Sequence, residues 1–192
     1  MPSAPDPARA ELDAPTLARA ARGEQAACTR FVAVYQRRVF AAIGRILGSR
    51  GTQGRVEELA QDAFVRALGA LPRFDADGPA RLSTWLLTIA TRVALNELRR
   101  SSVEVVPLLG CPEPAAPDQT ERLHARQALQ AAIDGLTAEQ RAVLVLHDLH
   151  GMTDGEVAEA LELGVAAVKS RLHRARVQLR KALRAQPTGG QG

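Results

Sequence analysis

Apolar residues recur at steps of three and four along most of the chain, which is the spacing that lines one face of an α-helix. Polar and charged residues lie between them, while glycine and proline gather in the intervening gaps. This pattern predicts an all-α protein. The predicted helices lie within residues 16–47, 55–71, 82–100, 120–134, 137–149, 153–161 and 165–184.

The segment 101–119 interrupts the helical pattern with four prolines, and its only formal charges are acidic. Because such a composition is typical of linkers, we expect two helical domains, 16–100 and 120–185, joined by a flexible acidic linker. The ends of the chain, residues 1–15 and 186–192, are rich in alanine and proline or in glycine, and we expect them to be disordered.

The stretch from Met152 to Arg184 reads as a short helix, a tight turn and a long basic helix. Thr153 and Glu156 have the spacing of a capping box at the start of the first helix. The long helix has one apolar stripe, a polar and cationic remainder and no acidic residue, as a major-groove reader requires. A solvated face on an ordinary bundle helix is the alternative. The capped helix and three-residue turn before it favour a helix-turn-helix in the second domain.

The overall composition excludes several classes of function. The net charge of +4 is modest, and the basic residues of the chain indicate nucleic-acid binding only where they cluster. Cys28 and Cys111 lie far apart, and His147 and His150 lack partners at ligand spacing, so we expect no disulfide, no metal site and no cofactor. The sequence contains no phosphate-binding loop and no nucleophile motif, so we do not expect an enzyme. No signal peptide or membrane span is evident, so we expect a cytoplasmic protein without membrane insertion.

Five segments together resemble bacterial sigma factors of the extracytoplasmic-function class of the sigma-70 family. In the second domain these are Leu136–Val143, Gly151–Ala158 and Val168–Arg176, which reads V-K-S-R-L-H-R-A-R. In the first domain they are Glu58–Ala67, similar to D-L-x-Q-E-x-F-x-R-A, and Ser83–Arg100, similar to the family's T-W-L helix. The resemblance implies a factor that binds core RNA polymerase and promoter DNA and directs promoter-specific initiation. It also suggests an anti-sigma factor as a partner.

The resemblance implies that Glu58, Gln61 and Asp62 dock on the clamp helices of the largest polymerase subunit. These three residues, here called the docking strip, are spaced to share one side of the predicted helix. An acidic and amide surface suits basic polymerase side chains. Without the motif, an ordinary solvated helix face would explain the same residues.

The resemblance also implies that the loop at 74–81 captures a base flipped from the minus-10 promoter element, with help from the helix that follows. Trp85 could stack on a base, although a place in the core is the simpler explanation for it. The residues predicted to act at this element, here called the minus-10 set, are Asp75, Asp77, Arg81, Trp85, Arg92, Asn96, Arg99 and Arg100.

In the second domain the resemblance implies readout of the minus-35 element. The residues that match base-reading positions, here called the reading face, are Lys169, Ser170, His173 and Arg174. Arginine suits the O6 and N7 acceptors of guanine. The predicted phosphate contacts, which would fix register rather than sequence, are Arg171, Arg176 and Arg180.

The chain departs from the family pattern at a few positions. Glu162 and Gly164 stand in the recognition turn where glycine and a capping serine are usual, so the turn is expected to be altered. Leu82 replaces a phenylalanine, and Thr91-Arg92 stands where Arg-Asn is common. A repressor or response-regulator output domain would explain the second domain alone, but it would have no use for the first-domain motifs.

Overall fold

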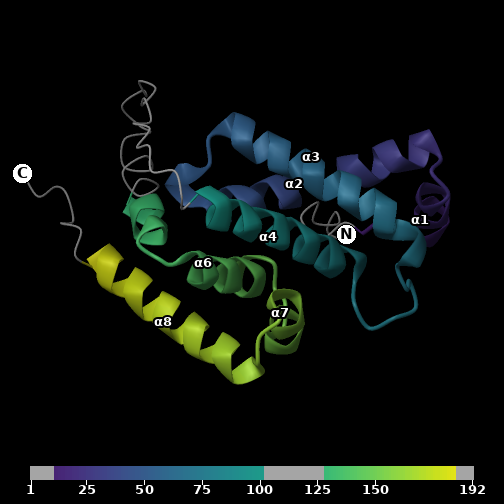
Figure 1. The fold of residues 1–192 in the computed structure, drawn as a ribbon. Helices are drawn as coiled ribbons and strands as arrows, with labels where there is room; N and C mark the ends of the chain where they lie inside the picture. Colours follow the sequence, from purple (N-terminus) through teal and green to yellow (C-terminus); the bar gives the residue numbers. More distant parts are fainter. Residues whose placement is uncertain (1–10, 102–127, 185–192) are drawn as a thin grey trace, which may run out of the picture.

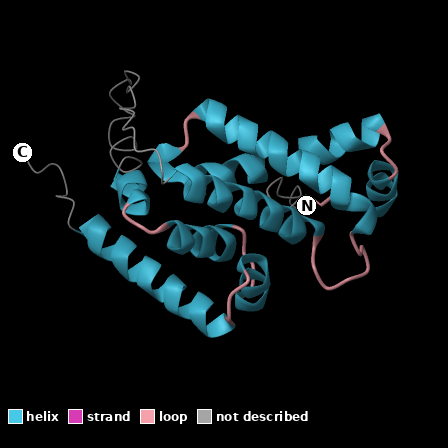
Figure 2. Ribbon diagram, viewed as in Figure 1, coloured by secondary structure: helices cyan, strands magenta, loops and turns pink. Residues whose placement is uncertain are grey.

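The computed structural model describes residues 11–101 and 128–184, and both parts are built from helices (Figures 1 and 2). The all-α fold class predicted from the sequence is confirmed for these residues. We refer to 11–101 as the N-terminal unit and to 128–184 as the C-terminal unit. The predicted linker 101–119, apart from residue 101, lies outside the described residues, as do residues 1–10, 120–127 and 185–192.

The N-terminal unit contains four α-helices and two short 3-10 turns. Their bounds are α1 Ala14–Ala21, α2 Gln25–Leu47, η2 Gly48–Arg50, α3 Gln53–Ala70, η3 Leu71–Arg73 and α4 Leu82–Ser101. Helix α1 begins inside the segment 1–15 that the sequence assigned to the tail, because the side chain of Asp13 accepts from the Thr16 amide and caps it. Thr52 caps α3 in the same way.

The long helix α2 forms the centre of the N-terminal unit, with α1, α3 and α4 packed around it. Phe31, Tyr35 and Phe64 are buried there, and the Phe31 and Phe64 rings meet edge to face with centroids 6.1 Å apart. Such large rings contribute much of the apolar area that stabilises a small helical unit.

The C-terminal unit consists of a helix over 128–134 and four further elements. Their bounds are α6 Ala138–Leu144, the π-helical segment η5 Val145–Leu149, α7 Asp154–Leu161 and α8 Val165–Arg184. The predicted capping box of Thr153 and Glu156 is confirmed, with both reciprocal hydrogen bonds present. Helices α7 and α8 form the predicted helix-turn-helix, and α8 buries Val168, Leu172 and Ala175.

The two units pack against each other in the structure. Helices α6 and α7 contact α4, while α6 and η5 contact α2, so one continuous apolar cluster includes residues of both units. Figure 1 shows α4 running beside α6 and α7. The sequence predicted two domains and gave no indication of this contact.

Candidate nucleic-acid and polymerase interfaces

The docking strip lies on the outer side of α3, opposite the buried residues Leu59, Ala63 and Phe64. Its two carboxylates pair with arginines one turn away on the same helix. These pairs are Arg55 Nη1 to Glu58 at 2.7 Å and Arg66 Nε to Asp62 at 2.8 Å. Exposed pairs of this kind contribute little to stability, so a partner can displace the arginines.

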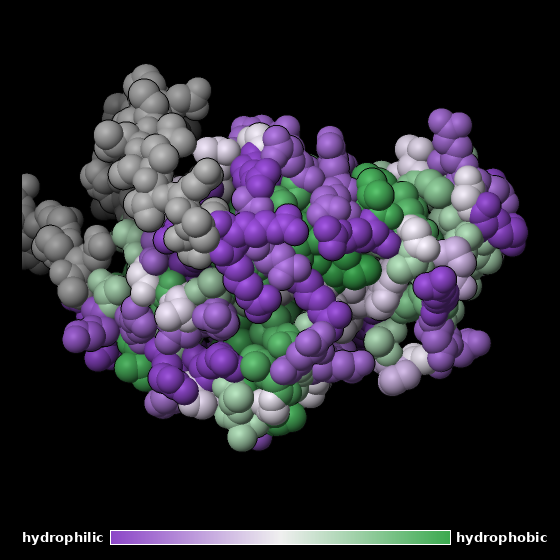
Figure 3. Space-filling view, viewed as in Figure 1, coloured by the Kyte–Doolittle hydropathy of each residue, from purple (hydrophilic) through white to green (hydrophobic). Residues whose placement is uncertain are grey.

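A second feature of this surface is the apolar side chain of Val65, which is 70% exposed just beyond the strip. Figure 3 shows hydrophilic side chains over the middle of the face that α3 and α4 present. The strip is therefore an accessible, mainly polar surface.

The loop before α4 is tied to that helix by two aromatic rings. Phe74 and Trp85 are half-buried, with ring centroids 5.1 Å apart. Asp75, Asp77 and Arg81 are exposed, and Asp75 accepts a hydrogen bond from the Asp77 amide at 3.1 Å. Trp85 thus supports the base of the loop while retaining a partly exposed surface.

The C-terminal half of α4 carries the basic members of the minus-10 set. Arg92, Asn96, Arg99 and Arg100 are exposed, and Arg99 donates to the Asn96 side chain at 3.2 Å. The opposite side of the helix is buried, including Thr91, which is fully enclosed. The polar residues therefore form a separate outward face at helical spacing.

On α8 the reading face points away from the buried stripe, and all four of its residues are exposed. Arg174 folds back to donate a hydrogen bond to the Ser170 hydroxyl at 2.7 Å. Among the predicted phosphate contacts, Arg171 is half-buried, and its Nη1 is enclosed without a hydrogen-bond partner. Arg180 is exposed on the flank.

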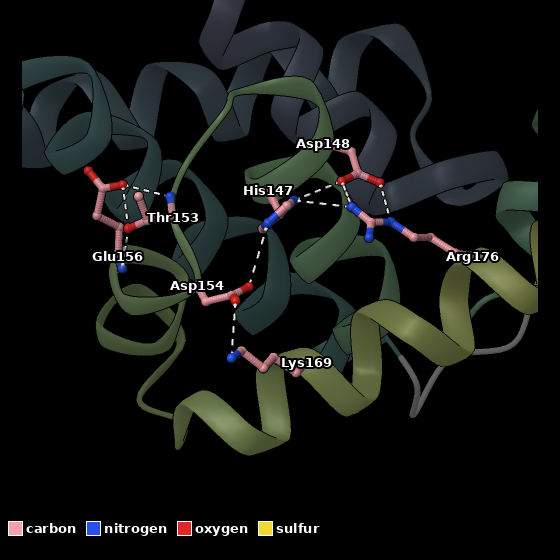
Figure 4. A network of polar contacts seen from close by, with 7 residues as sticks. All are labelled: His147, Asp148, Thr153, Asp154, Glu156, Lys169 and Arg176. Carbon is pink, nitrogen blue, oxygen red and sulfur yellow. Dashed lines mark hydrogen bonds and ion pairs between the residues drawn. The ribbon is translucent and has the colours of Figure 1, made fainter.

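A network of charged side chains holds α8 against the preceding elements (Figure 4). Arg176 donates two hydrogen bonds to Asp148, the Nε one at 3.0 Å, and His147 Nδ1 lies 2.8 Å from the same carboxylate. The other ring nitrogen of His147 lies 3.5 Å from Asp154, which is 3.9 Å from Lys169 Nζ. Two cations of the long helix are therefore already engaged by acidic groups.

This network changes the electrostatics of Asp148. The pKa of its carboxyl lies below the usual value, chiefly because Arg176 donates hydrogen bonds to it. The sequence indicated the cations of α8 but missed these carboxylates, because an acidic residue on a neighbouring helix has no fixed spacing to its partner.

His150 follows η5 directly, and nothing in the sequence indicated that its ring would be partly buried. Its ring is partly buried, and its Nε2 has no hydrogen-bond partner among the described residues. Burial, together with the smaller effect of the nearby cations Arg45 and Arg38, lowers the pKa of His150 to about 4. The imidazole is therefore neutral near pH 7.

Two family models match the chain, one on each unit. Residues 31–103 match sigma-70 region 2, and residues 126–179 match sigma-70 region 4. The chain is 30% identical over 181 residues to the ECF RNA polymerase sigma factor SigW of Bacillus subtilis, covering 85% of this chain and 92% of that protein. It is 31% identical over 167 residues to the ECF RNA polymerase sigma factor SigC of Mycobacterium tuberculosis, covering 82% and 83%.

Solved structures give the same result. CnrH, in complex with the cytosolic domain of CnrY, superposes with a TM-score of 0.62 at 29% identity, covering 89% of this chain and 96% of that one. RpoE of Bartonella quintana, in complex with the anti-sigma factor NepR, superposes with a TM-score of 0.65 at 21% identity, covering 82% of this chain and 97% of that one. At that lower identity the likeness concerns the fold alone.

The fold and these matches define a DNA-binding initiation factor of two helical regions. The chain belongs to the extracytoplasmic-function class of the sigma-70 family. It directs promoter-specific transcription initiation by RNA polymerase, with region 2 recognising the minus-10 element and region 4 the minus-35 element. In the parts of the chain that the structure describes, no helix has both the length and the apolar character to cross a membrane.

Proposed function

We propose that the reading face of α8 selects the minus-35 element, with Arg174 as its main base contact. The observation that carries this assignment is the exposure of all four reading-face residues on one side of a helix whose other side is buried. Arg171, Arg176 and Arg180 are the proposed phosphate contacts on its flanks. Arg176 must exchange the carboxylate of Asp148 for a phosphate to act in this way.

The minus-10 set defines a second DNA surface, on the N-terminal unit. We propose that the exposed loop residues and the ring of Trp85 receive an unstacked base, and that the cations of α4 contact the freed strand. The proposed residues are Asp75, Asp77, Arg81, Trp85, Arg92, Asn96, Arg99 and Arg100.

We further propose that the docking strip of Glu58, Gln61 and Asp62 contacts core RNA polymerase, so that the chain acts in the cytoplasm where polymerase meets DNA. Sigma factors are not enzymes, and we propose that this chain likewise leaves the chemistry to the polymerase. The domain limits proposed for this division of labour are those predicted above, 16–100 and 120–185.

An Arg174→Ala variant tests the reading assignment. Run-off transcription with core polymerase on a promoter library should show relaxed selectivity at one base position, because a bidentate arginine contact contributes about 1–3 kcal/mol of discrimination. The matched control is Arg184→Ala, an exposed arginine at the end of the same helix. An Arg174→Ala protein with wild-type selectivity would remove this residue from the reading face.

An Asp62→Lys variant tests the docking strip. Its affinity for core polymerase should fall at least about tenfold, because a like charge then faces basic partner side chains. Glu57→Lys makes the same charge change at an exposed neighbouring position of α3 and serves as the control. Equal losses in both variants would show a general charge effect rather than a docking strip.

We also infer that an anti-sigma factor restrains the chain. RpoE of Bartonella quintana, which has the same fold, was solved with such a partner. Purification of the tagged chain from its host before induction should yield a protein that competes with core polymerase for it. A captured protein that leaves polymerase binding unchanged would contradict this inference.

A further inference from the structure

We propose that Arg55 is a positioning residue for the minus-10 surface: it holds the carboxylate of Glu97 against α3 and so keeps Arg100 available to the promoter strand. Arg55 itself lies on α3, outside the minus-10 set, and makes none of the proposed DNA contacts. The inference rests on the proposed assignment of Arg100 to that set, and variants of the two arginines tell the two proposals apart.

A single guanidinium joins the start of α3 to the C-terminal half of α4. Arg55 donates from Nε to Glu97 Oε1 at 2.9 Å, and its Nη2 contacts the same oxygen. Its Nη1 donates to Glu58 Oε2 at 2.7 Å. The Glu97 side chain is 14% exposed and that of Glu58 66%, so solvent screens the contact with Glu97 less. Hydrogen bonds to Glu97 first, and to Glu58 second, raise the pKa of Arg55.

The position of Arg55 on its helix supports a role in this pairing. It is the third residue of α3, and its amide donates to the Thr52 hydroxyl that caps the helix. The first turn of a helix carries partial positive charge and favours acidic residues, but α3 has none there. A cation is therefore unfavourable at this position by itself, and the two carboxylates that it binds offset the cost.

Glu97 is the acidic residue that lies closest in sequence to the cations of the minus-10 set. It follows Asn96 directly and precedes Arg100 by three residues, which is the spacing of an ion pair along one helix. In the structure its carboxylate is bound to Arg55 of α3, and Arg100 is exposed. Without Arg55, Glu97 would pair with Arg100 and withdraw that cation from the DNA strand.

Arg66 offers a comparison on the same helix. Its Nε donates to Asp62 at 2.8 Å, so it too pairs with a carboxylate of the docking strip. That pair lies within α3, whereas Arg55 also reaches α4. A polymerase side chain that takes Glu58 from Arg55 would leave the contact with Glu97 in place. The link to α4 is therefore what distinguishes Arg55 from an ordinary partner of the docking strip.

Holoenzyme assembled from core polymerase and the full-length chain provides the test. It is titrated onto a forked probe of a promoter selected in the run-off library, with the minus-10 element single-stranded. Arg55→Gln should weaken binding about two- to fivefold, because Arg100 then has to leave an exposed ion pair to reach the strand. The dependence of log affinity on log salt should become less steep by about 0.7, the contribution of one phosphate contact to a single strand.

The double variant Arg55→Gln, Glu97→Gln should restore both the affinity and the salt dependence, because no carboxylate is left to capture Arg100. Arg66→Gln is the matched control and should change neither value. The affinity for core polymerase is measured for every variant, which separates effects on docking from effects on DNA. Wild-type values in Arg55→Gln, a double variant as weak as the single one, or an equal loss in Arg66→Gln would each overturn the proposal.

Arg100→Gln separates the positioning role from the assignment on which it rests. This variant should weaken binding to the same extent, and Arg55→Gln should have no further effect in its background. If Arg100→Gln alone kept wild-type affinity, Arg100 would leave the minus-10 set and the positioning role would lose its object. If it weakened binding while Arg55→Gln did not, the minus-10 assignment would stand and the positioning role would be refuted.

Discussion

Arg141 allows the energy of the interface between the two units to be tested directly. Its guanidinium donates to the Ile46 carbonyl across the interface at 2.8 Å and to the Leu136 carbonyl at 2.9 Å. Hydrogen bonds from a charged donor contribute about 1.5–3 kcal/mol each. Burial lowers the pKa of Arg141, which reflects the desolvation that offsets part of this gain. We expect Arg141→Met to lower the free energy of unfolding by about 2–4 kcal/mol.

Urea unfolding followed by two signals provides the assay. The fluorescence of Trp85, the single tryptophan, reports the N-terminal unit, while circular dichroism at 222 nm reports both units. The wild-type transitions should coincide because one apolar cluster joins the units. In Arg141→Met the dichroism should fall first, as the C-terminal unit loses its anchor.

Arg37→Met, at an exposed position on α2, is the matched control and should change stability by less than about 0.5 kcal/mol. If Arg141→Met lost less than about 1 kcal/mol and its two transitions still coincided, the buried arginine would not be the anchor. The argument for a specific interface would then fail with it.

Three further predictions follow from the same structure. Gly48→Ala should destabilise the chain by at least about 2 kcal/mol in thermal melts, because Gly48 has a φ of +63 and the new Cβ would meet a carboxylate oxygen of Asp134. Gly54→Ala is the control, because a Cβ there would meet open space, and it should be neutral or stabilising. The pKa of His150 is about 4 in the folded chain and about 6.5 in the unfolded chain, so the free energy of unfolding should fall by up to about 3 kcal/mol as the pH drops from about 6.5 to about 4. His150→Gln should flatten this dependence of stability on pH. An unchanged dependence in the variant would contradict the burial argument. Asp148→Asn should lower the free energy of unfolding by about 1 kcal/mol at neutral pH, where the wild-type carboxylate pairs with Arg176. This difference should vanish in acid, as the wild-type carboxyl becomes protonated below its unfolded pKa of about 3.8. A difference that persists in acid would rule out the ion pair as its cause.

The helices, the capping box of Thr153 and Glu156, and the helix-turn-helix could be predicted from the sequence because their causes are local. Thr153 and Glu156 are three residues apart, and the buried Val168, Leu172 and Ala175 repeat at helical steps. The family assignment also followed from contiguous motifs, and the matches to regions 2 and 4 confirm it. The roles of individual site residues remain predictions.

Only the tertiary structure decided which charges are paired and with what. Arg92 and Ala160 are 68 residues apart, and Arg141 and Ile46 are 95 apart, so no local spacing links them. In the sequence Arg92 is one more exposed cation, and Glu162 is one departure from a turn motif. The ion pair that joins them depends on how two helical units pack, which is set by apolar burial over the whole interface rather than by either residue.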